Sequence, residues 1–203
     1  MQRMIVLSQT YRRSGAAPQT GDPQNRFLSH MPIRRLDAEE IRDSILAVSG
    51  SLDKTTGGPS VKIHVNEFQV GRGRPATSGP LDGSGRRSIY LEVRRNFLTP
   101  LLFAFDYPSP TTTIGRRLVS SVPAQALTLM NNEFVSAQAN KWADRVESEY
   151  TDPRERLDAV YLEIFARLPD PAERDRIAKF LAENSWRDLA HVLFNAKEFL
   201  FLR

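Results

Sequence analysis

An apolar stripe in the last third of the chain most strongly limits how this sequence can fold. Its six side chains recur at intervals of three and four residues, which places them on one face of a helix: Leu157, Val160, Tyr161, Ile164, Phe165 and Leu168. Asp152-Pro153 ahead of the stripe is a typical helix start, and Asp170-Pro171 repeats it with Glu173 three residues after the aspartate. The sequence therefore predicts successive helices after residue 152.

Helix signals continue on both sides of this stripe. Pro123 opens a helix that Asn131 or Asn132 ends or recaps. The helix after it carries a seam: Phe134, Val135, Gln138, Trp142 and Val146. A last helix carries four small or apolar residues: Leu189, Leu193, Ala196 and Leu200. Because the turns between the last three helices are short, we expect antiparallel packing in a bundle-like C-terminal part.

The N-terminal part has weaker signals. Asp37 with Glu40 starts one helix, and residues 99–105 form a second, short one. Residues 12–32 and 53–86 are rich in glycine, proline and polar residues, which predicts loops. Residues 87–93 alternate apolar and polar side chains and are the best strand, with a second short strand at 61–65. The predicted fold class is mainly α, with one or two short strands in a loop-rich N-terminal part.

Charge divides the chain at about the same place. Residues 1–117 hold 17 Lys and Arg against 10 Asp and Glu, whereas residues 118–203 hold 11 against 14. We therefore predict a basic segment, 1–117, and an acidic helical segment, 118–203, that share one core. Residues 1–7 resemble the end of a helix, so we expect a fragment of a longer protein.

Composition excludes several classes of site. The chain has no cysteine, so disulfides, thiol catalysis, zinc–cysteine sites and cysteine-attached haem are excluded within it. No apolar run approaches the ~18 residues that a membrane span needs. The three histidines, His30, His64 and His191, lack metal-ligand spacing, so we expect no metal site.

Arginine supplies 23 of the 28 basic residues, and five Arg-Arg pairs fall within residues 1–117. Adjacent residues on a strand point to opposite faces, so each pair can send one guanidinium inward and one outward. This favours structural bridging between layers over a phosphate-binding face. The glycine-rich segments 71–74 and 83–87 match no phosphate-binding loop, and we interpret them as flexible surface loops.

No motif names a reaction. Asp106 and Glu92 could form the carboxylate pair of a glycoside hydrolase, but nothing in the sequence fixes their separation. An arginine-paired Asp106 is the favoured interpretation.

Four blocks of sequence resemble a known family. Residues 85–96 read GRRSIYLEVRRN, 105–108 read FDYP, 115–117 read GRR and 123–131 read PAQALTLMN. Together with residues 35–43 and 188–190, they resemble a planctomycete-specific C-terminal domain of unknown function. That domain occurs in large exported proteins, often behind a planctomycete cytochrome c domain.

The resemblance implies an extracytoplasmic setting and a haem elsewhere in the parent protein, with no cofactor in this chain. It implies no activity and no catalytic residue. Ten polar positions match the family's motifs and could form one buried network or line a pocket: Arg87, Tyr90, Arg94, Arg95, Asn96, Asp106, Arg116, Arg117, Gln125 and Asn131.

Three hypotheses follow. The first is a non-catalytic structural or interaction module whose partners are other domains of the parent protein or an anionic polysaccharide. The second is a carbohydrate-active hydrolase that uses Asp106 or Glu92. The third, a basic nucleic-acid-binding module, is disfavoured because the sequence lacks the clustered footprint that nucleic acid requires.

Overall fold

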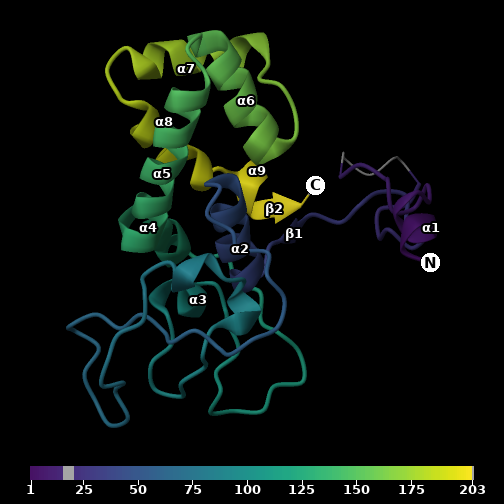
Figure 1. Cartoon of the computed structure of the whole chain (residues 1–203). Helices are drawn as coiled ribbons and strands as arrows, with labels where there is room; N and C mark the ends of the chain where they lie inside the picture. The colour runs from purple at the N-terminus through teal and green to yellow at the C-terminus, as the bar shows by residue number, and fades with distance from the viewer. Residues whose placement is uncertain (16–20, 203) are drawn as a thin grey trace.

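The predicted mainly helical fold is confirmed. A computed structural model describes residues 1–15 and 21–202, so part of the predicted 12–32 loop lies outside the described residues. Figure 1 shows the later helices stacked at one end of the molecule, α2 in the middle, and α3 with long loops at the other end. The helices are α1 (Gln2–Val6), α2 (Ala38–Val48), α3 (Pro100–Ala104), α4 (Pro123–Asn131), α5 (Glu133–Glu149), α6 (Pro153–Phe165), α7 (Pro171–Leu181), α8 (Trp186–Phe194) and α9 (Lys197–Leu200).

The helices α2, α5, α6 and α7 begin at the predicted polar caps. The Asp170 carboxylate accepts from the Glu173 N–H at 2.7 Å, while the Glu173 carboxylate accepts from the Asp170 N–H. Asn132 ends α4 and caps α5, since its side-chain oxygen accepts from two N–H groups of the first turn. One prediction is wrong: the last helix is two, because the chain turns at Asn195 and Ala196 between α8 and α9.

The core is centred on α5. All five seam residues are buried, and α8 packs along α5 more extensively than any other pair of elements. Trp142 of α5 stacks on Phe194 of α8 with ring centroids 5.2 Å apart. Ile41, Ile45 and Leu46 of α2 join the same cluster, so the main core takes residues from both the basic and the acidic segment.

The predicted strand at 87–93 is wrong. Ser88–Tyr90 form a 3₁₀ turn, and only Leu91 makes a bridge, with Val61. Ile89 is 77% and Val93 52% exposed, so only Leu91 of the expected apolar face packs against the main core. The second expected strand, 61–65, is reduced to this bridge, although Ile63 and Val65 are buried in a small cluster.

The described residues contain one two-stranded sheet, which the sequence did not reveal. β1 (Arg34–Arg35) pairs antiparallel with β2 (Phe201–Leu202), so the start of the folded body meets the end of the chain. Figure 1 shows α1 lying away from this sheet. No residue of α1 is buried.

The sequence predicts a surface loop at the glycine-rich turn Gly83–Gly85, and this prediction is wrong. Gly83 and Gly85 are buried, Gly83 against Arg42 of α2 and Gly85 against Ser51 just after α2. Gly85 has a φ of +69°, and a Cβ there would collide with the carbonyl oxygen of Ser51. The turn is therefore fixed by close backbone packing.

No helix among the described residues has both the length and the apolar character that crossing a membrane requires.

Candidate functional site

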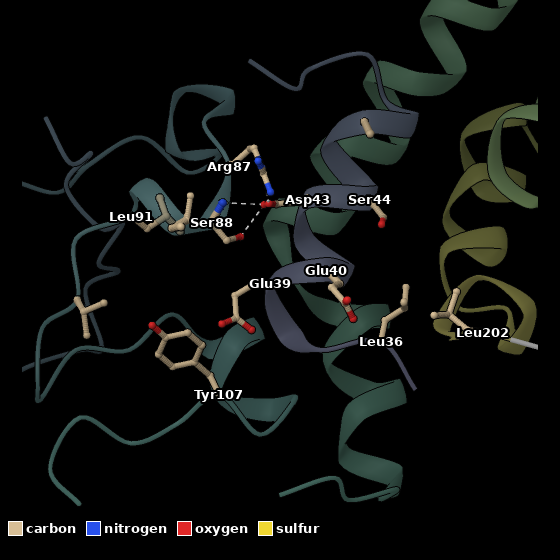
Figure 2. A pocket seen from close by; sticks show the side chains of 13 residues that line it. Leu36, Glu39, Glu40, Asp43, Ser44, Arg87, Ser88, Leu91, Tyr107 and Leu202 are labelled. Atoms are coloured by element: carbon tan, nitrogen blue, oxygen red, sulfur yellow. Dashed lines mark hydrogen bonds and ion pairs between the residues drawn. The ribbon is translucent and has the colours of Figure 1, made fainter. Parts of the chain in front are cut away.

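A groove of about 690 Å³ runs along the exposed side of α2 (Figure 2). We call it the α2 groove. Three carboxylates project from α2 along it: Glu39, Glu40 and Asp43. Opposite them lie Arg87 and the phenol of Tyr107, and the remaining wall is largely apolar: Leu36, Ala47, Ile89, Leu91, Val93 and Leu202.

Asp43 holds the 3₁₀ turn against α2. Its Oδ1 accepts from both the N–H and the Oγ–H of Ser88, each at 2.7 Å, as the dashed lines of Figure 2 mark. Arg87 Nε lies 3.7 Å from Oδ2. The carboxylate is thus fully engaged in fixing the wall of the groove.

The two glutamates are each clamped by a guanidinium. Arg117 donates two hydrogen bonds to Glu39 at 2.6 and 2.7 Å, and Arg34 donates two to Glu40 at 3.2 Å. Burial is the largest single influence and would raise the pKa of both carboxyls, but the hydrogen bonds from the arginines, a backbone N–H and the arginine charges together outweigh it and lower both pKa values. Both glutamates are therefore ionised and paired at neutral pH. Such acids are poorly suited to donating a proton or acting as a general base.

Asp106 belongs to a second polar cluster, formed with Arg35 and Ser120. Arg35, with 4% of its side chain exposed, donates from Nη2 to Asp106 Oδ2 at 2.9 Å. Ser120 donates its N–H and its hydroxyl to the same carboxylate. Burial raises the pKa of Asp106, but the Ser120 N–H and Arg35 outweigh it and hold that pKa below its usual value. The arginine-paired interpretation of Asp106 is confirmed.

Arg35 also secures the loop that carries Asp106. It donates to the carbonyl oxygens of Phe105 and Ser120, and Gln125 donates to the Ser120 hydroxyl at 3.1 Å. These contacts tie β1, the end of α3 and the start of α4 together. The cluster therefore works as an internal brace.

Arg42 is a second buried arginine, with 3% of its side chain exposed. Its guanidinium donates to the carbonyl oxygens of Asp82 and Arg86 and to the Ser88 hydroxyl, and it lies over the ring of Phe134. It anchors the 82–88 loop to α2. Burial lowers the pKa of Arg42, although the carboxylates of Asp43 and Asp82 oppose this.

The ten motif residues divide among several places. Asp106 and Gln125 lie together around Ser120, while Arg87 and Arg117 contact carboxylates of the α2 groove. The other six lie apart from these two clusters. Tyr90 lies under the guanidinium of Arg86 and accepts from the Gly57 N–H, and Asn96 donates to the Arg72 carbonyl. Arg94 pairs with Glu92 and Asn131 donates to the Leu127 carbonyl, while Arg95 and Arg116 are exposed.

Glu92 and Asp106 share no partner, since Glu92 pairs with Arg94 at 2.8 Å and Asp106 with Arg35. The described residues contain no group of three or more His, Asp or Glu that could hold a metal ion.

The sequence reasoning missed Arg35 and Arg42 as the centres of these clusters. The signal for Arg42 was present, because it lies four residues after Ala38 and three before Ile45, on the apolar face of α2. A charged residue on a buried helix face needs several partners to be stable. The signal for Arg35 was the Arg-Arg pair at a strand, where Arg34 is exposed and Arg35 buried.

Comparisons with known proteins agree with the resemblance. Neither the curated proteins nor the solved structures gave a match to this chain. A family model described as PSD1, protein of unknown function (DUF1553), matches residues 1–181. Since the match covers most of the 203 residues, this chain belongs to the PSD1 (DUF1553) family.

Proposed function

We propose that this chain is a non-catalytic structural and interaction module. The observation that carries the proposal is that the carboxylates of the two polar clusters are already bound by side chains of the chain itself. Asp106, Glu39, Glu40 and Asp43, the acids of the two polar clusters, are each held by hydrogen bonds or ion pairs from arginine or serine. These contacts occupy the carboxylates within the fold, and they lower the pKa values of Glu39, Glu40 and Asp106, whereas a hydrolytic acid needs a raised pKa and access to substrate.

Asp106→Asn tests this proposal. Asparagine tolerates the φ of +61° that Asp106 adopts, so the substitution changes the charge without adding backbone strain. Its amide nitrogen would face donors of Arg35 or Ser120, and Arg35 would lose its buried counter-charge. We expect a loss of about 2–3 kcal/mol in the free energy of unfolding, which is about 4–12 °C in Tm for a chain of this size.

Asp144→Asn is the matched control, because its ion pair with Arg187 is exposed and should contribute little. Both variants and the parent chain are assayed by thermal unfolding and for hydrolysis of neutral and acidic glycans. The hydrolase hypothesis predicts the reverse pattern. Turnover by the parent chain that is lost in Asp106→Asn, at unchanged Tm, would overturn the proposal.

We further propose that the module belongs to an exported planctomycete protein with a haem-bearing cytochrome c domain, and that its partners are the other domains of that protein. The family resemblance supports the setting. The N-terminal arm, of which the structure describes residues 1–15 and 21–33, supports the contact, because Met4 is 74% and Phe27 80% exposed while α1 buries nothing. Large apolar side chains grouped on one segment favour a protein contact.

Hydrogen exchange on the intact parent protein checks the proposed contact of the arm, and cell fractionation with haem absorbance checks the proposed setting. In the purified chain, we expect amides of the arm to exchange fast, and in the parent protein to be protected at least about tenfold. The parent protein should appear in the extracytoplasmic fraction and show haem absorbance. Equal exchange of the arm in both samples would contradict the contact, and a cytoplasmic protein without haem would contradict the setting.

A further inference from the structure

A second cavity, of about 240 Å³, lies between the 64–69 loop, the start of α3 and the junction of α4 and α5. We call it the amide pocket. Its polar lining includes Asn66, Gln69, Asn131 and Asn132, and Leu81 and Leu101 contribute apolar surface. Four carboxamides around one small cavity distinguish it from the α2 groove, whose polar groups are carboxylates and arginines.

The carboxamide oxygens of this pocket hold its walls in place. Asn66 and Gln69 each accept from the other's backbone N–H, at 3.0 and 3.1 Å, and the Asn132 oxygen accepts from the first turn of α5. Since a backbone N–H can only donate, these bonds fix which side-chain atom is oxygen. The NH₂ groups of Asn66 and Asn132 have no hydrogen-bond partner among the described residues. Both are donors available to a ligand.

Three further groups lining the pocket offer acceptors. Thr99 occupies the N-cap of α3 without a side-chain hydrogen bond, and Glu133 has no polar partner among the described residues. His64 Nδ1 lies 3.1 Å from the Gly79 carbonyl oxygen, which can only accept. The Ser78 hydroxyl lies 3.2 Å from Nδ1 and donates to the same carbonyl oxygen, and in the tautomer that carries the ring proton on Nδ1 the lone pair of Nε2 is left for a ligand.

The charge of the pocket disfavours an anion. Its one cationic lining residue is Arg42, whose guanidinium already donates to Asp82, Arg86 and Ser88. The Glu133 carboxylate would repel a second negative charge. Amide donors beside hydroxyl, imidazole and carboxylate acceptors suit a ligand whose own groups both donate and accept, as hydroxyls do.

We propose that the amide pocket binds a neutral polyhydroxylated ligand about the size of one sugar ring. Its hydroxyl oxygens would accept hydrogen bonds from the NH₂ groups of Asn66 and Asn132, and its hydroxyl protons would be donated to Thr99, Glu133 and His64. Leu81 and Leu101 supply the apolar surface on which the C–H groups of such a ring can lie. This site adds a ligand to the non-catalytic module and does not depend on which domains flank it.

The side-chain NH₂ signals of Asn66 and Asn132 give a direct readout. The ¹⁵N-labelled full chain is titrated by NMR with glucose, galactose, mannose and N-acetylglucosamine, and separately with glucuronate and inorganic phosphate. We expect saturable shifts of both NH₂ signals with at least one neutral sugar, and weaker binding of glucuronate than of glucose.

Two variants remove ligand contacts without removing a bond within the fold. Thr99→Val and Glu133→Ala should each weaken sugar binding by roughly threefold to tenfold, the effect of one hydrogen bond. Glu155→Ala is the control for Glu133→Ala, because Glu155 lies in the first turn of α6 and lines no part of the amide pocket. Thr113→Val, in an exposed loop, is the control for Thr99→Val.

Failure has three distinct forms. The proposal is overturned if no neutral sugar shifts the two NH₂ signals at up to about 50 mM, a limit corresponding to less than 2 kcal/mol of binding free energy. It is also overturned if glucuronate or phosphate binds and the neutral sugars do not. Equal affinities for the parent chain, Thr99→Val and Glu133→Ala would place any binding elsewhere.

Discussion

Arg34 and Arg35 are neighbours with opposite environments. Arg34 leaves 45% of its side chain exposed and pairs with Glu40, which is 44% exposed. Arg35 is buried and donates to Asp106, Phe105 and Ser120 across about 70 to 85 residues of chain. An exposed ion pair contributes little because water screens it, whereas a buried guanidinium without its partners is costly.

We therefore predict very different losses for the same substitution at the two positions. Arg35→Met should cost about 3–5 kcal/mol, because it leaves the Asp106 carboxylate without its counter-charge and removes the Arg35 donor from the buried Phe105 carbonyl. Arg34→Met should cost at most about 1 kcal/mol. Urea unfolding of both variants checks this. If Arg35→Met does not fold, Arg35→Lys, which keeps the charge but not the planar fork, should still lose more than Arg34→Lys. Equal losses in the free energy of unfolding at the two positions would show that Arg35 does not stabilise the fold through its buried contacts.

Among the secondary-structure elements, the helices were predictable because their caps and apolar spacing depend on residues close together in the sequence. Asp170-Pro171 with Glu173, and Asn132 before Phe134, supply their own hydrogen bonds, so these helix starts were predictable from a few residues. The Trp142 seam was predictable for the same reason, because its spacing belongs to one helix.

The strands were not predictable in this way, because a strand needs a partner. Residues 87–93 alternate apolar and polar side chains as a strand does. The Ser88 N–H, however, donates to the side chain of Asp43, 45 residues away, and Ser88–Tyr90 form a 3₁₀ turn. The real sheet joins Arg35 to Phe201, from opposite ends of the folded body. The same limit applies to the candidate site, since the sequence suggested an arginine for Asp106 but could not say that it is Arg35.

Across the whole molecule, carboxylates with lowered pKa values join distant parts of the chain. Glu39 pairs with Arg117, Asp106 with Arg35, and Glu173 at the start of α7 with Arg167, whose guanidinium also contacts α9. Hydrogen bonds from Arg167 lower the pKa of Glu173 from 4.5 to about 2. The folded state thus depends on keeping these acids ionised.

This dependence predicts acid instability with a definite pH range. An acid whose pKa is lower in the folded state binds protons more readily when unfolded, so its contribution is complete above its unfolded pKa and is lost as pH falls towards the folded value. For Glu173 that range runs from about pH 4.5 down to about 2. The free energy of unfolding, measured by urea titration from pH 7 to pH 2, should stay nearly level above pH 5.5 and then fall. Glu173→Gln should be less stable at pH 7 and lose less on acidification. Glu155→Gln should follow the parent curve, because Glu155, in the first turn of α6, has no ion pair with any residue that the structure describes. A Glu173→Gln curve parallel to that of the parent chain would mean that the Arg167 clamp contributes nothing to acid sensitivity, and the loss would then have to come from Glu39, Glu40 and Asp106.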